Sequence, residues 1–540
     1  MSYNLSEKIR KIPPHLWILT AIILMGIFLR VYNFHAWLEF KGDQARDAML
    51  VSQVVQGNSP WPLLGPFMTN SATSGGESFH VGPIYYYFQI MAAKIFGDYP
   101  DKLAYPDLLF SILTIPLLYY FWRKYFEQNL ALGLTGLYAI SFFALKYSRF
   151  AWNSNLIPFF VLLFLLALYE FQLKKEKVVW QWVILLGVAL GIGVQLHVIL
   201  LIIFSLFTFA FLLFSIVKNK KMWKKWLVVL AIFLLLNAGQ IASEIQTNFA
   251  NSKTFLNYFL HKPTVGEIQE KHPASLFNDF DCHLEANFFM LSSMGEDSCQ
   301  YYLNNLSTGE TTKIFNTFFF RLSLFVSVVF SVLGYVVLGF YCRKEASPAQ
   351  KQWLQLIAIY LGLAFLIMFP VLKGKIELRY FSFAFFVPFL FLGLFVKYLK
   401  ARVNKEVALF GATLLFCLVV ASNLVSITSI TKEFLHKTRI YSNSVVLDEL
   451  EPIAQYLLAN SAEEKIYFSG NPRIINYLYQ PLKYLINKQG KQLVPVAEIQ
   501  IDSFIQNKNT LFFLTNKIDS ESNFSYEKVG QKTYVYKLMN

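Results

Sequence analysis

Runs of about twenty apolar residues recur along this chain, and they constrain its fold more than any other feature. A helix needs roughly 20 mainly apolar residues to cross the hydrocarbon core of a bilayer. Hydrophobic residues fill 55% of the 540 positions and charged residues only 15%, whereas a soluble chain carries about 25% charged residues. This composition excludes a single soluble enzyme, a disordered chain, a collagen-like fibre and a disulfide-rich scaffold.

We expect about eleven membrane-spanning helices. The first lacks a small-residue cleavage site, which indicates a membrane anchor rather than a cleaved signal peptide. A further apolar stretch at 83–96 is short and contains Lys94, so we interpret it as a re-entrant or juxtamembrane helix. The expected spans lie near 16–34, 104–122, 129–146, 155–173, 179–196, 197–217, 226–243, 315–341, 353–372, 379–396 and 407–429.

The charged residues indicate how these spans are oriented. The 48 basic and 34 acidic residues give a net charge of +14, which in a soluble protein would suggest nucleic-acid binding. In a membrane protein, basic residues retained in cytoplasmic loops are the first explanation. Basic clusters follow the second, fourth, sixth, eighth and tenth spans. With eleven crossings they share one side with the N-terminus, which predicts a cytoplasmic N-terminus and a C-terminus outside.

The chain therefore divides into a membrane-embedded domain at 1–429 and a C-terminal domain at 430–540. Residues 35–103 and 244–313 form the two large outer loops of the first domain. The tail alternates helical patterns at 444–460 and 472–488 with short β-rich runs at 465–469, 509–515 and 532–537, which is typical of a small α/β domain. The expected fold is an α-helical polytopic membrane protein with a small extracytoplasmic α/β domain.

Two of the four cysteines share the second outer loop. In an oxidising compartment Cys282 and Cys299 could form a disulfide that closes a ring of ~18 residues, worth about 3 kcal/mol in the chain-entropy model. The alternative is two free thiols.

The first outer loop opens with an acidic residue followed three positions later by an arginine. Asp43 and Arg46 would share one helix face at this spacing. In the simpler interpretation, Asp43 caps the helix and Arg46 is an exposed partner. In the functional one, the pair forms part of a site.

The same loop continues with a glycine pair, Glu77, His80 and then Pro83 before a Tyr-rich helix. Glu77 and His80 could share a metal ion. Two ligands are too few, because zinc sites usually use three or four, so loop capping and hydrogen bonding are the competing interpretation.

Other polar residues converge on the outer boundary of the membrane. Ionisable groups at span ends often extend toward water, but convergence at one depth also indicates a polar cavity that opens outward. Basic members of such a set could hold a phosphate at headgroup depth. The residues are Arg149, Asn153, Asn155, Gln195, His197, Glu244, Lys373, Lys375, Glu377 and Arg379.

Several motifs stand in a fixed order relative to the spans. They are Leu29-Arg30-Val31-Tyr32, Asp43-Gln44-Ala45-Arg46, the run from His80 to Tyr87, the run from Tyr147 to Asn153, Gly193-x-Gln195-x-His197, Glu244 to Ser252, and Arg379-Tyr380. Over about residues 15–400 this order resembles the polyprenyl-phosphate-sugar-dependent glycosyltransferases of the GT-C fold. Within that fold, the order is similar to that in the bacterial protein O-mannosyltransferase-like group, glycosyltransferase family thirty-nine, and more distantly to that in the lipid A aminoarabinose transferase.

The resemblance implies a catalytic role for Asp43, the first-loop carboxylate of that fold. Family members often have a second acid beside it, where this chain has Gln44. Lipid A transferases have a basic residue before the proline of the Tyr-rich helix, for which His80 is the local candidate. Many relatives have an acid in the Arg149 segment, where this chain has Asn153 and Asn155. The family is also typical of a bacterial inner membrane.

The chemistry of the residues agrees with this function. A carboxylate can act as general base toward an acceptor hydroxyl, a step that typically contributes about 10²–10⁴-fold. Basic groups can stabilise the departing lipid phosphate. The expected substrates are a polyprenyl-phosphate sugar and a protein, lipid or glycan acceptor, with inversion implied by the family and a divalent metal compatible with it. Substrate-binding candidates are Arg46, His80, Arg149, Asn153, His197 and Arg379, supported by Asp47, Glu77, Asn155, Gln195 and Glu244.

Three other functions remain open at this point. A lipid-sugar flippase would need paired half-repeats or helices broken at mid-membrane, and the sequence indicates neither. A polymerase or ligase would transfer a lipid-linked oligosaccharide instead of one sugar. A scaffold for the outer tail would not need eleven spans.

Overall fold

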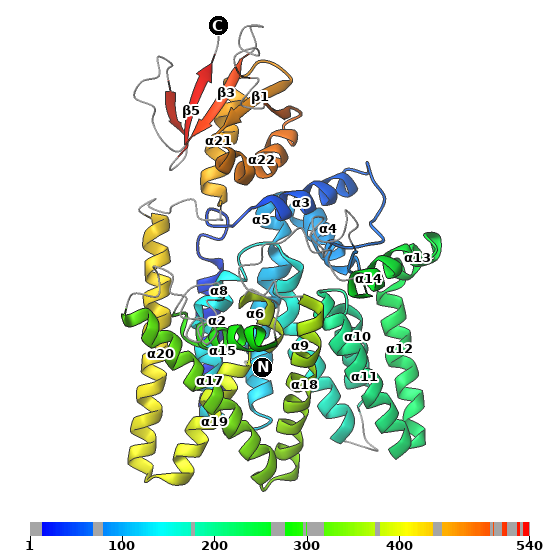
Figure 1. Cartoon of the computed structure of the whole chain (residues 1–540), viewed down its shortest axis with the longest axis vertical. Coiled ribbons are helices and arrows are strands. Elements are labelled where there is room, and N and C mark those ends of the chain that lie inside the picture. The colour runs from blue at the N-terminus through cyan, green and yellow to red at the C-terminus, as the bar shows by residue number, and fades with distance from the viewer. Residues whose placement is uncertain are drawn as a thin grey trace, which may run out of the picture.

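The computed structural model describes most of the chain and arranges it in three layers (Figure 1). A bundle of long helices forms one end, a small unit with a sheet forms the other, and short helices lie between them. Of the expected residues, Glu77, Lys373, Lys375 and Glu377 lie outside the described residues. The residues that the structure describes are 13–67, 79–173, 179–260, 276–294, 299, 318–372, 378–435, 445–496, 501, 510–515, 526–529 and 533–538.

Each of the eleven apolar runs coincides with a helix or with two consecutive helices. Runs that the sequence presents as continuous are divided at 140–142, 236–238 and 384–387. The elements are α2 Pro14–Val31, α6 Tyr105–Trp122, α7 Gln128–Ile140, α8 Phe142–Lys146, η1 Asn153–Leu156, α9 Ile157–Leu173, α10 Trp180–Gly193, α11 Val198–Lys218, η2 Lys220–Met222, α12 Trp223–Leu236, α13 Ala238–Gln246, α17 Phe318–Lys344, α18 Pro348–Leu372, η4 Leu378–Ala384, α19 Val387–Arg402 and α20 Lys405–Leu435.

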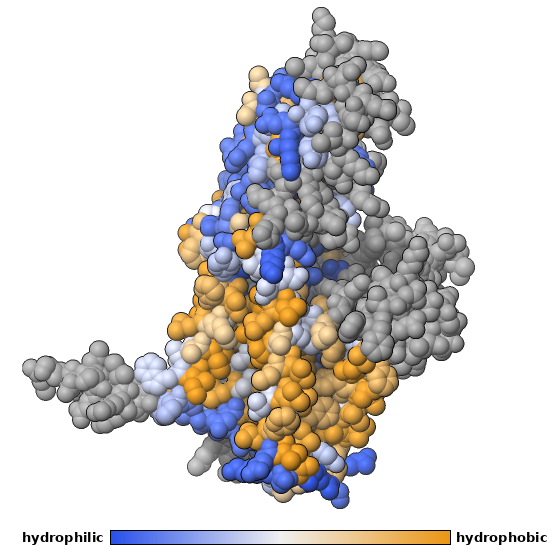
Figure 2. All heavy atoms as spheres, turned by 90° about the vertical axis from the view of Figure 1, so that its left-hand side faces the viewer, coloured by the Kyte–Doolittle hydropathy of each residue, from blue (hydrophilic) through white to orange (hydrophobic). Residues whose placement is uncertain are grey.

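This part of the chain is a multi-pass membrane protein. Six helices in the described residues are long and apolar enough to cross a membrane, and two bent pairs, α12 with α13 and η4 with α19, bring the number to eight. On the face shown in Figure 2, apolar surface covers the bundle and gives way to hydrophilic surface at both ends. The larger number of eleven crossings, which counts α6, α7 and α10 as well, stays a prediction.

Helix α9 forms the centre of the bundle. Buried residues make up 89% of its apolar stretch, compared with 11% for α2 and α20. Aromatic rings fill the space around α9, and Phe164 stacks on Phe204 of α11 with ring centroids 3.9 Å apart. Helices with an apolar surface on all sides are suited to this position because no face needs contact with water.

The basic turns lie at the end of the bundle opposite the sheet. Figure 1 shows the turns after α11, α17 and α19 together at this end. They carry Lys218 and Lys220, Arg343 and Lys344, and Arg402, respectively. Three of the basic clusters that the sequence places on one side of the membrane therefore lie at one end of the bundle.

The middle layer contains short helices of the two large loops, which are α3 Gly42–Val55, α4 Ile84–Phe96, α5 Pro100–Leu103 and α14 Ala250–Leu260. Helix α15 Leu276–Ser292, from the second of these loops, packs instead against the bundle helices α17 and α19. Helix α4 confirms the helix expected at 83–96. Its 13 residues rise only about 20 Å, less than the ~30 Å core of a bilayer. This length agrees with a juxtamembrane helix.

The C-terminal unit packs two helices against a five-stranded sheet of order β2-β1-β3-β5-β4. Strands β2, β1 and β3 are parallel, whereas β5 and β4 complete the sheet in antiparallel fashion. Both predicted helices and three predicted strands are present, but β2 and β4 were not predicted. The bounds are α21 Leu447–Ala459, β1 Lys465–Gly470, α22 Pro472–Asn487, β2 Gln492–Pro495, β3 Leu511–Thr515, β4 Tyr526–Val529 and β5 Thr533–Leu538.

The structure pairs Cys282, on α15, with Cys299 as a disulfide. Cys342 and Cys417 are free. Between the two alternatives for the outer-loop cysteines, the bonded form is therefore the one present.

This pairing predicts the number of reactive thiols in protein isolated from membranes. After denaturation without reductant, the chain should take up two maleimide groups, at Cys342 and Cys417, and four after reduction, as measured by mass spectrometry. A Cys282→Ser variant should take up three without reductant, because Cys299 loses its partner. Four groups on the unreduced wild type would contradict the disulfide.

Candidate active site

The first outer helix, α3, begins so that Asp43 lies in its first turn with an exposed carboxylate. Lys41 is the N-cap residue, and the side chain of Gln44 caps the helix by accepting a hydrogen bond from Lys41 N at 3.1 Å. The interpretation of Asp43 as the cap is therefore wrong. Gln44, which stands where relatives often carry an acid, has this capping function and is itself buried.

Arg46 connects two carboxylates of the same helix. Its Nη1 lies 3.0 Å from Asp43 Oδ1 and its Nη2 lies 2.8 Å from Asp47 Oδ1. The Asp43 side chain is 73% exposed and that of Asp47 only 9%. One guanidinium thus holds an accessible carboxylate on one side and a buried carboxylate on the other.

Phe67 joins this pair to His80. The guanidinium of Arg46 lies over the Phe67 ring, 4.3 Å from its centroid, and the His80 ring meets the same phenyl edge-on at 6.3 Å. His80 Nδ1 lies 2.8 Å from the carbonyl oxygen of Gly65, so Nδ1 carries the proton. In the neutral ring, Nε2 is then an acceptor. Arg46 therefore contacts Asp43 directly and is linked to His80 through the ring of Phe67.

Glu244 and Asn251 hold the backbone of His80. The Asn251 amide accepts from His80 N at 2.7 Å and donates to His80 O at 3.0 Å. Glu244 accepts from Ser252 Oγ at 2.9 Å and from Asn251 Nδ2 at 3.4 Å. The α13–α14 turn therefore fixes His80 in place, and Glu244 acts on it only through Asn251.

The Tyr-rich helix α4 positions the buried carboxylate. Tyr86 donates to Asp47 Oδ1 at 2.9 Å. Burial raises the pKa of Asp47 to about 6, although the neighbouring Arg46 charge and the Tyr86 hydroxyl oppose this shift. Asp47 is thus buried where Asp43 is exposed. Its contacts with Arg46 and Tyr86 are those of a residue that orients Arg46.

A second group of polar residues lines a pocket between the η1 region, the start of α11 and η4. Its lining includes Trp152, Ser154, His197, Arg379 and Tyr380. The Arg379 guanidinium lies 5.3 Å from the centre of the Trp152 ring. His197 Nδ1 accepts from Ile199 N at 3.2 Å, so a neutral ring carries its proton on Nε2 as a donor. This pocket combines a cation, a ring N–H and aromatic walls.

Asn153, Asn155 and Gln195 hold the backbone around this pocket. Asn153 donates to the carbonyl of Leu196, next to His197, and Asn155 donates to Phe150 O at 2.8 Å. Gln195 accepts from Ile84 N, at the start of α4, at 3.1 Å. All three are buried, and these contacts are structural.

Asp107, which the sequence analysis did not select, links the two groups. It accepts from Tyr85 of α4 at 2.9 Å and from Trp152 N at 3.0 Å. Trp152 lines the pocket, so Tyr85 connects α4 to the pocket through Asp107. The adjacent Tyr86 holds Asp47. Helix α4 therefore contributes to both groups of polar residues. An ionisable residue near the start of an apolar helix was the signal that could have identified Asp107.

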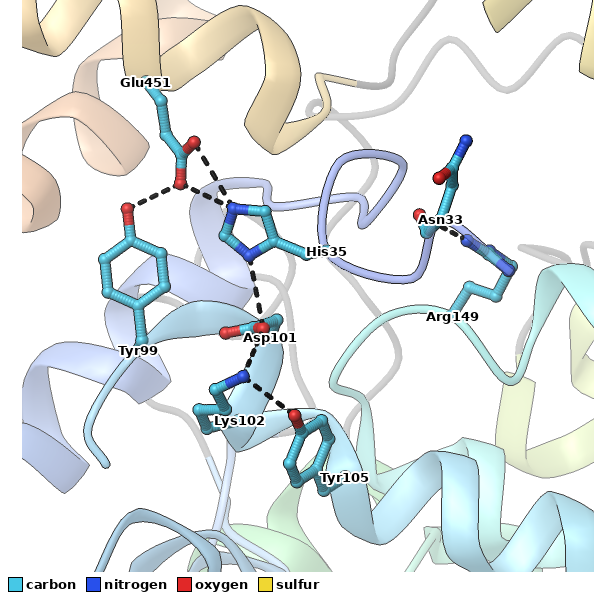
Figure 3. Close-up of polar contacts among 8 residues, drawn as sticks. All are labelled: Asn33, His35, Tyr99, Asp101, Lys102, Tyr105, Arg149 and Glu451. Carbon is cyan, nitrogen blue, oxygen red and sulfur yellow. Dashed lines mark hydrogen bonds and ion pairs between the residues drawn. The ribbon is translucent and has the colours of Figure 1, made fainter. Parts of the chain in front are cut away.

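Arg149 holds the end of the first helix. Its guanidinium donates to the carbonyl oxygens of Arg30, Tyr32 and Asn33 at 3.0, 2.9 and 2.9 Å, and Figure 3 shows the contact with Asn33. Burial lowers the pKa of Arg149 to about 10, so it remains charged at neutral pH. It does not line the pocket of Arg379 and His197, and its phosphate-binding role stays a prediction.

The described residues contain no cluster of three or more His, Cys, Asp or Glu side chains that could hold a metal ion. His80, one of the two metal-ligand candidates, is described, and its Nδ1 faces a carbonyl oxygen.

Comparison with known proteins identifies the class of enzyme. Residues 80–238 match the model of the dolichyl-phosphate-mannose-protein mannosyltransferase family. The chain is a membrane glycosyltransferase related to this family. The matched segment includes His80, Arg149, Asn153, Gln195 and His197, whereas Asp43 and Arg379 lie outside it. No curated protein matches the glycosyltransferase significantly in sequence.

The fold of the glycosyltransferase is that of ArnT. It superimposes on the crystal structure of ArnT from Cupriavidus metallidurans bound to undecaprenyl phosphate with a TM-score of 0.54 and 11% identity, covering 97% of this chain and 98% of ArnT. The oligosaccharyltransferase of Archaeoglobus fulgidus is also similar, with a TM-score of 0.49 and 14% identity over 93% of this chain and 69% of that one.

Replacing Asp47 with asparagine should flatten the pH dependence of stability between about pH 4 and 6. The raised pKa means that the folded protein binds this proton more tightly than the unfolded chain. The wild type therefore loses stability as pH rises through this interval, by up to roughly 3 kcal/mol for a shift of this size. The melting temperature of detergent-solubilised protein should fall less with pH in Asp47→Asn.

Tyr86→Phe is the matched control. It keeps the carboxyl group but removes a hydrogen bond that favours the ionised form, so the loss of stability should extend to higher pH. Equal slopes in the wild type and Asp47→Asn would show that Asp47 does not titrate in this range.

Proposed function

We propose that this enzyme transfers a sugar from a polyprenyl-phosphate donor to a hydroxyl group of a protein, lipid or glycan acceptor, with inversion and with Asp43 as general base. One observation carries the proposal. The Asp43 carboxylate is exposed in the outer layer, and Arg46 fixes its direction. The family match of residues 80–238 and the ArnT-like fold support the donor class.

The distribution of basic residues supports a site on the outer face. The turns after α11, α17 and α19 lie opposite the layer that carries Asp43 (Figure 1). The positive-inside rule assigns such basic turns to the cytoplasm. The acceptor would then arrive from outside, and the lipid donor from the outer leaflet.

The reaction needs one proton acceptor and one anion site. The acceptor oxygen attacks the anomeric carbon, Asp43 takes the hydroxyl proton, and the bond between that carbon and the phosphate oxygen breaks. The lipid phosphate leaves with the bonding electrons, and attack opposite this group inverts the anomeric centre. His80 Nε2 is available in the neutral ring as an acceptor for a substrate hydroxyl.

The pocket of Arg379 and His197 is our candidate for the phosphate. A guanidinium and a ring N–H can both donate to phosphate oxygens, and Trp152 and Tyr380 provide aromatic walls. The guanidinium of Arg149 already holds three carbonyl groups of the α2 end. We therefore assign Arg149 to positioning and the phosphate contact to Arg379.

Asp43→Asn should lower sugar release from a radiolabelled polyprenyl-phosphate monosaccharide by about 10²–10⁴-fold, the usual contribution of a general base. The measurement is the rate of release by purified protein with saturating donor. Glu406→Gln is the matched control, because it removes an exposed acid from the first turn of another helix, α20, and should keep the wild-type rate.

Equal rates for wild type and Asp43→Asn would remove Asp43 as the base and direct attention to Asp47 or Glu77. Donor movement between leaflets without any sugar release would instead favour a flippase.

Arg379→Gln should raise the KM for the donor. Loss of a charged hydrogen bond of about 1.5–3 kcal/mol corresponds to roughly a 10- to 150-fold change. Arg402→Gln, which removes an exposed arginine at the basic end of the bundle, is the control. An unchanged KM in Arg379→Gln, with correctly folded protein, would place the phosphate elsewhere.

A further inference from the structure

We propose that the C-terminal unit positions helix α3, so that residues of α21 and α22 determine the placement of the Asp43 carboxylate. This inference rests on the proposed role of Asp43. It gives a function to a unit whose sequence suggests none, and it makes Tyr484, Lys488 and Glu451 positioning residues for a reaction that they do not touch.

The first contact is a polar junction centred on Asp98, in the turn between α4 and α5. Asp98 accepts from Ser52 of α3 at 2.6 Å and from Tyr484 of α22 at 2.9 Å. Lys488 Nζ, just after α22, lies 3.3 Å from the same carboxylate. One largely buried carboxylate therefore links α3 to the C-terminal unit.

The second contact is a polar junction centred on His35, in the linker between α2 and α3 (Figure 3). His35 Nε2 lies 3.1 Å from Glu451 of α21, and Nδ1 lies 3.2 Å from Asp101 of α5. Tyr99 donates to the same Glu451 at 2.6 Å. Both ring nitrogens thus face carboxylates, and the linker is tied to α5 and to the C-terminal unit together.

Backbone pairing fixes the segment immediately before α3. Phe40 N donates to Val445 O at 2.9 Å, and Leu447 N donates to Leu38 O at 3.1 Å. The Phe40 ring packs edge-on against Tyr484 with centroids 5.4 Å apart. Asp43 follows Phe40 by only three residues, so a shift of this paired segment would move the carboxylate.

The two sides of α3 have different functions. At 100° per residue, Ala45, Ala48 and Ser52 project from one side, whereas Asp43 and Arg46 project from the opposite one. Ala45 and Ala48 belong to the same buried apolar cluster as Leu478 and Leu482 of α22. The C-terminal unit therefore supports the back of the helix and leaves the Asp43 side accessible.

Small displacements matter for this chemistry. A misplacement of about 1 Å by a remote substitution can cost about 10²-fold in rate. The residues of the phosphate pocket come from the η1 region, α11 and η4, not from the C-terminal unit. A loosened α3 should therefore reduce kcat and leave the KM for the donor nearly unchanged.

The test uses the full-length enzyme with the double substitution Tyr484→Phe and Lys488→Met, which removes both partners that the C-terminal unit supplies to Asp98 and keeps the Tyr484 ring. We expect kcat to fall about tenfold or more with little change in the donor KM. Tyr526→Phe, which removes a hydroxyl from the exposed edge strand β4, should behave as wild type. A second double variant, Tyr484→Phe with Lys488→Arg, keeps a positive charge beside Asp98 and should therefore have a higher kcat than the variant with Lys488→Met.

Hydrogen–deuterium exchange of the α3 amides provides a second measurement that does not depend on activity. Exchange should be faster in the double variant than in the wild type and Tyr526→Phe. Unchanged exchange overturns the inference whatever Asp43→Asn does. An unchanged kcat, in an assay where Asp43→Asn has lost turnover, overturns it while the proposed function stands. Wild-type turnover in Asp43→Asn overturns the proposed function itself.

Discussion

A polar group within a bilayer needs a hydrogen-bond partner inside the protein. This requirement limits where polar side chains can lie in the enzyme. Arg30, fully buried near the end of α2, donates to Ser111 and to the carbonyl oxygens of Gly26 and Ala139. Arg149 then occupies the carbonyl groups at the same helix end. The polar groups of the candidate site lie at the ends of spans and in the short helices between the bundle and the sheet, where water can solvate them.

Helix α4 joins the two polar groups of the candidate site through its hydrogen bonds. Its tyrosines point to two carboxylates on different elements, since Tyr86 donates to Asp47 and Tyr85 donates to Asp107. Gln195 accepts from the first amide of the same helix. The helix is too short to cross the membrane, yet its hydrogen bonds tie the Asp43 helix, the Trp152 wall of the pocket and the turn before His197 into one framework. Two of the three consecutive tyrosines, Tyr85 and Tyr86, thus connect the helix of Asp43 to the pocket of Arg379 and His197.

The sequence predicts the parts of the molecule that depend on local patterns. Each of the eleven apolar runs found by hydropathy is helical in the described residues, and the spacing of Asp43 and Arg46 predicts their ion pair. The role of Arg149 could not be predicted, because its partners are backbone carbonyl groups more than a hundred residues away and carry no side-chain signature. An acid near the start of an apolar helix could have drawn attention to Asp107, but its partners Tyr85 and Trp152 N become apparent only in the structure. Strands β2 and β4 are four residues each, too short for a clear alternation.

The proposed role of Asp43 also gives a function to the C-terminal unit. Helix α3 has only 14 residues, and an isolated helix of that length is marginal in water. It must obtain its stability from packing, and the face toward the substrate must remain open. Helix α4 holds it through Asp47, and α22 supports it from behind through Asp98 and the apolar cluster of Ala45. In the proposed mechanism, the direction of the Asp43 carboxylate therefore depends on Tyr484 and its neighbours, about 440 positions later in the chain, which couples the C-terminal unit to the reaction in the membrane domain.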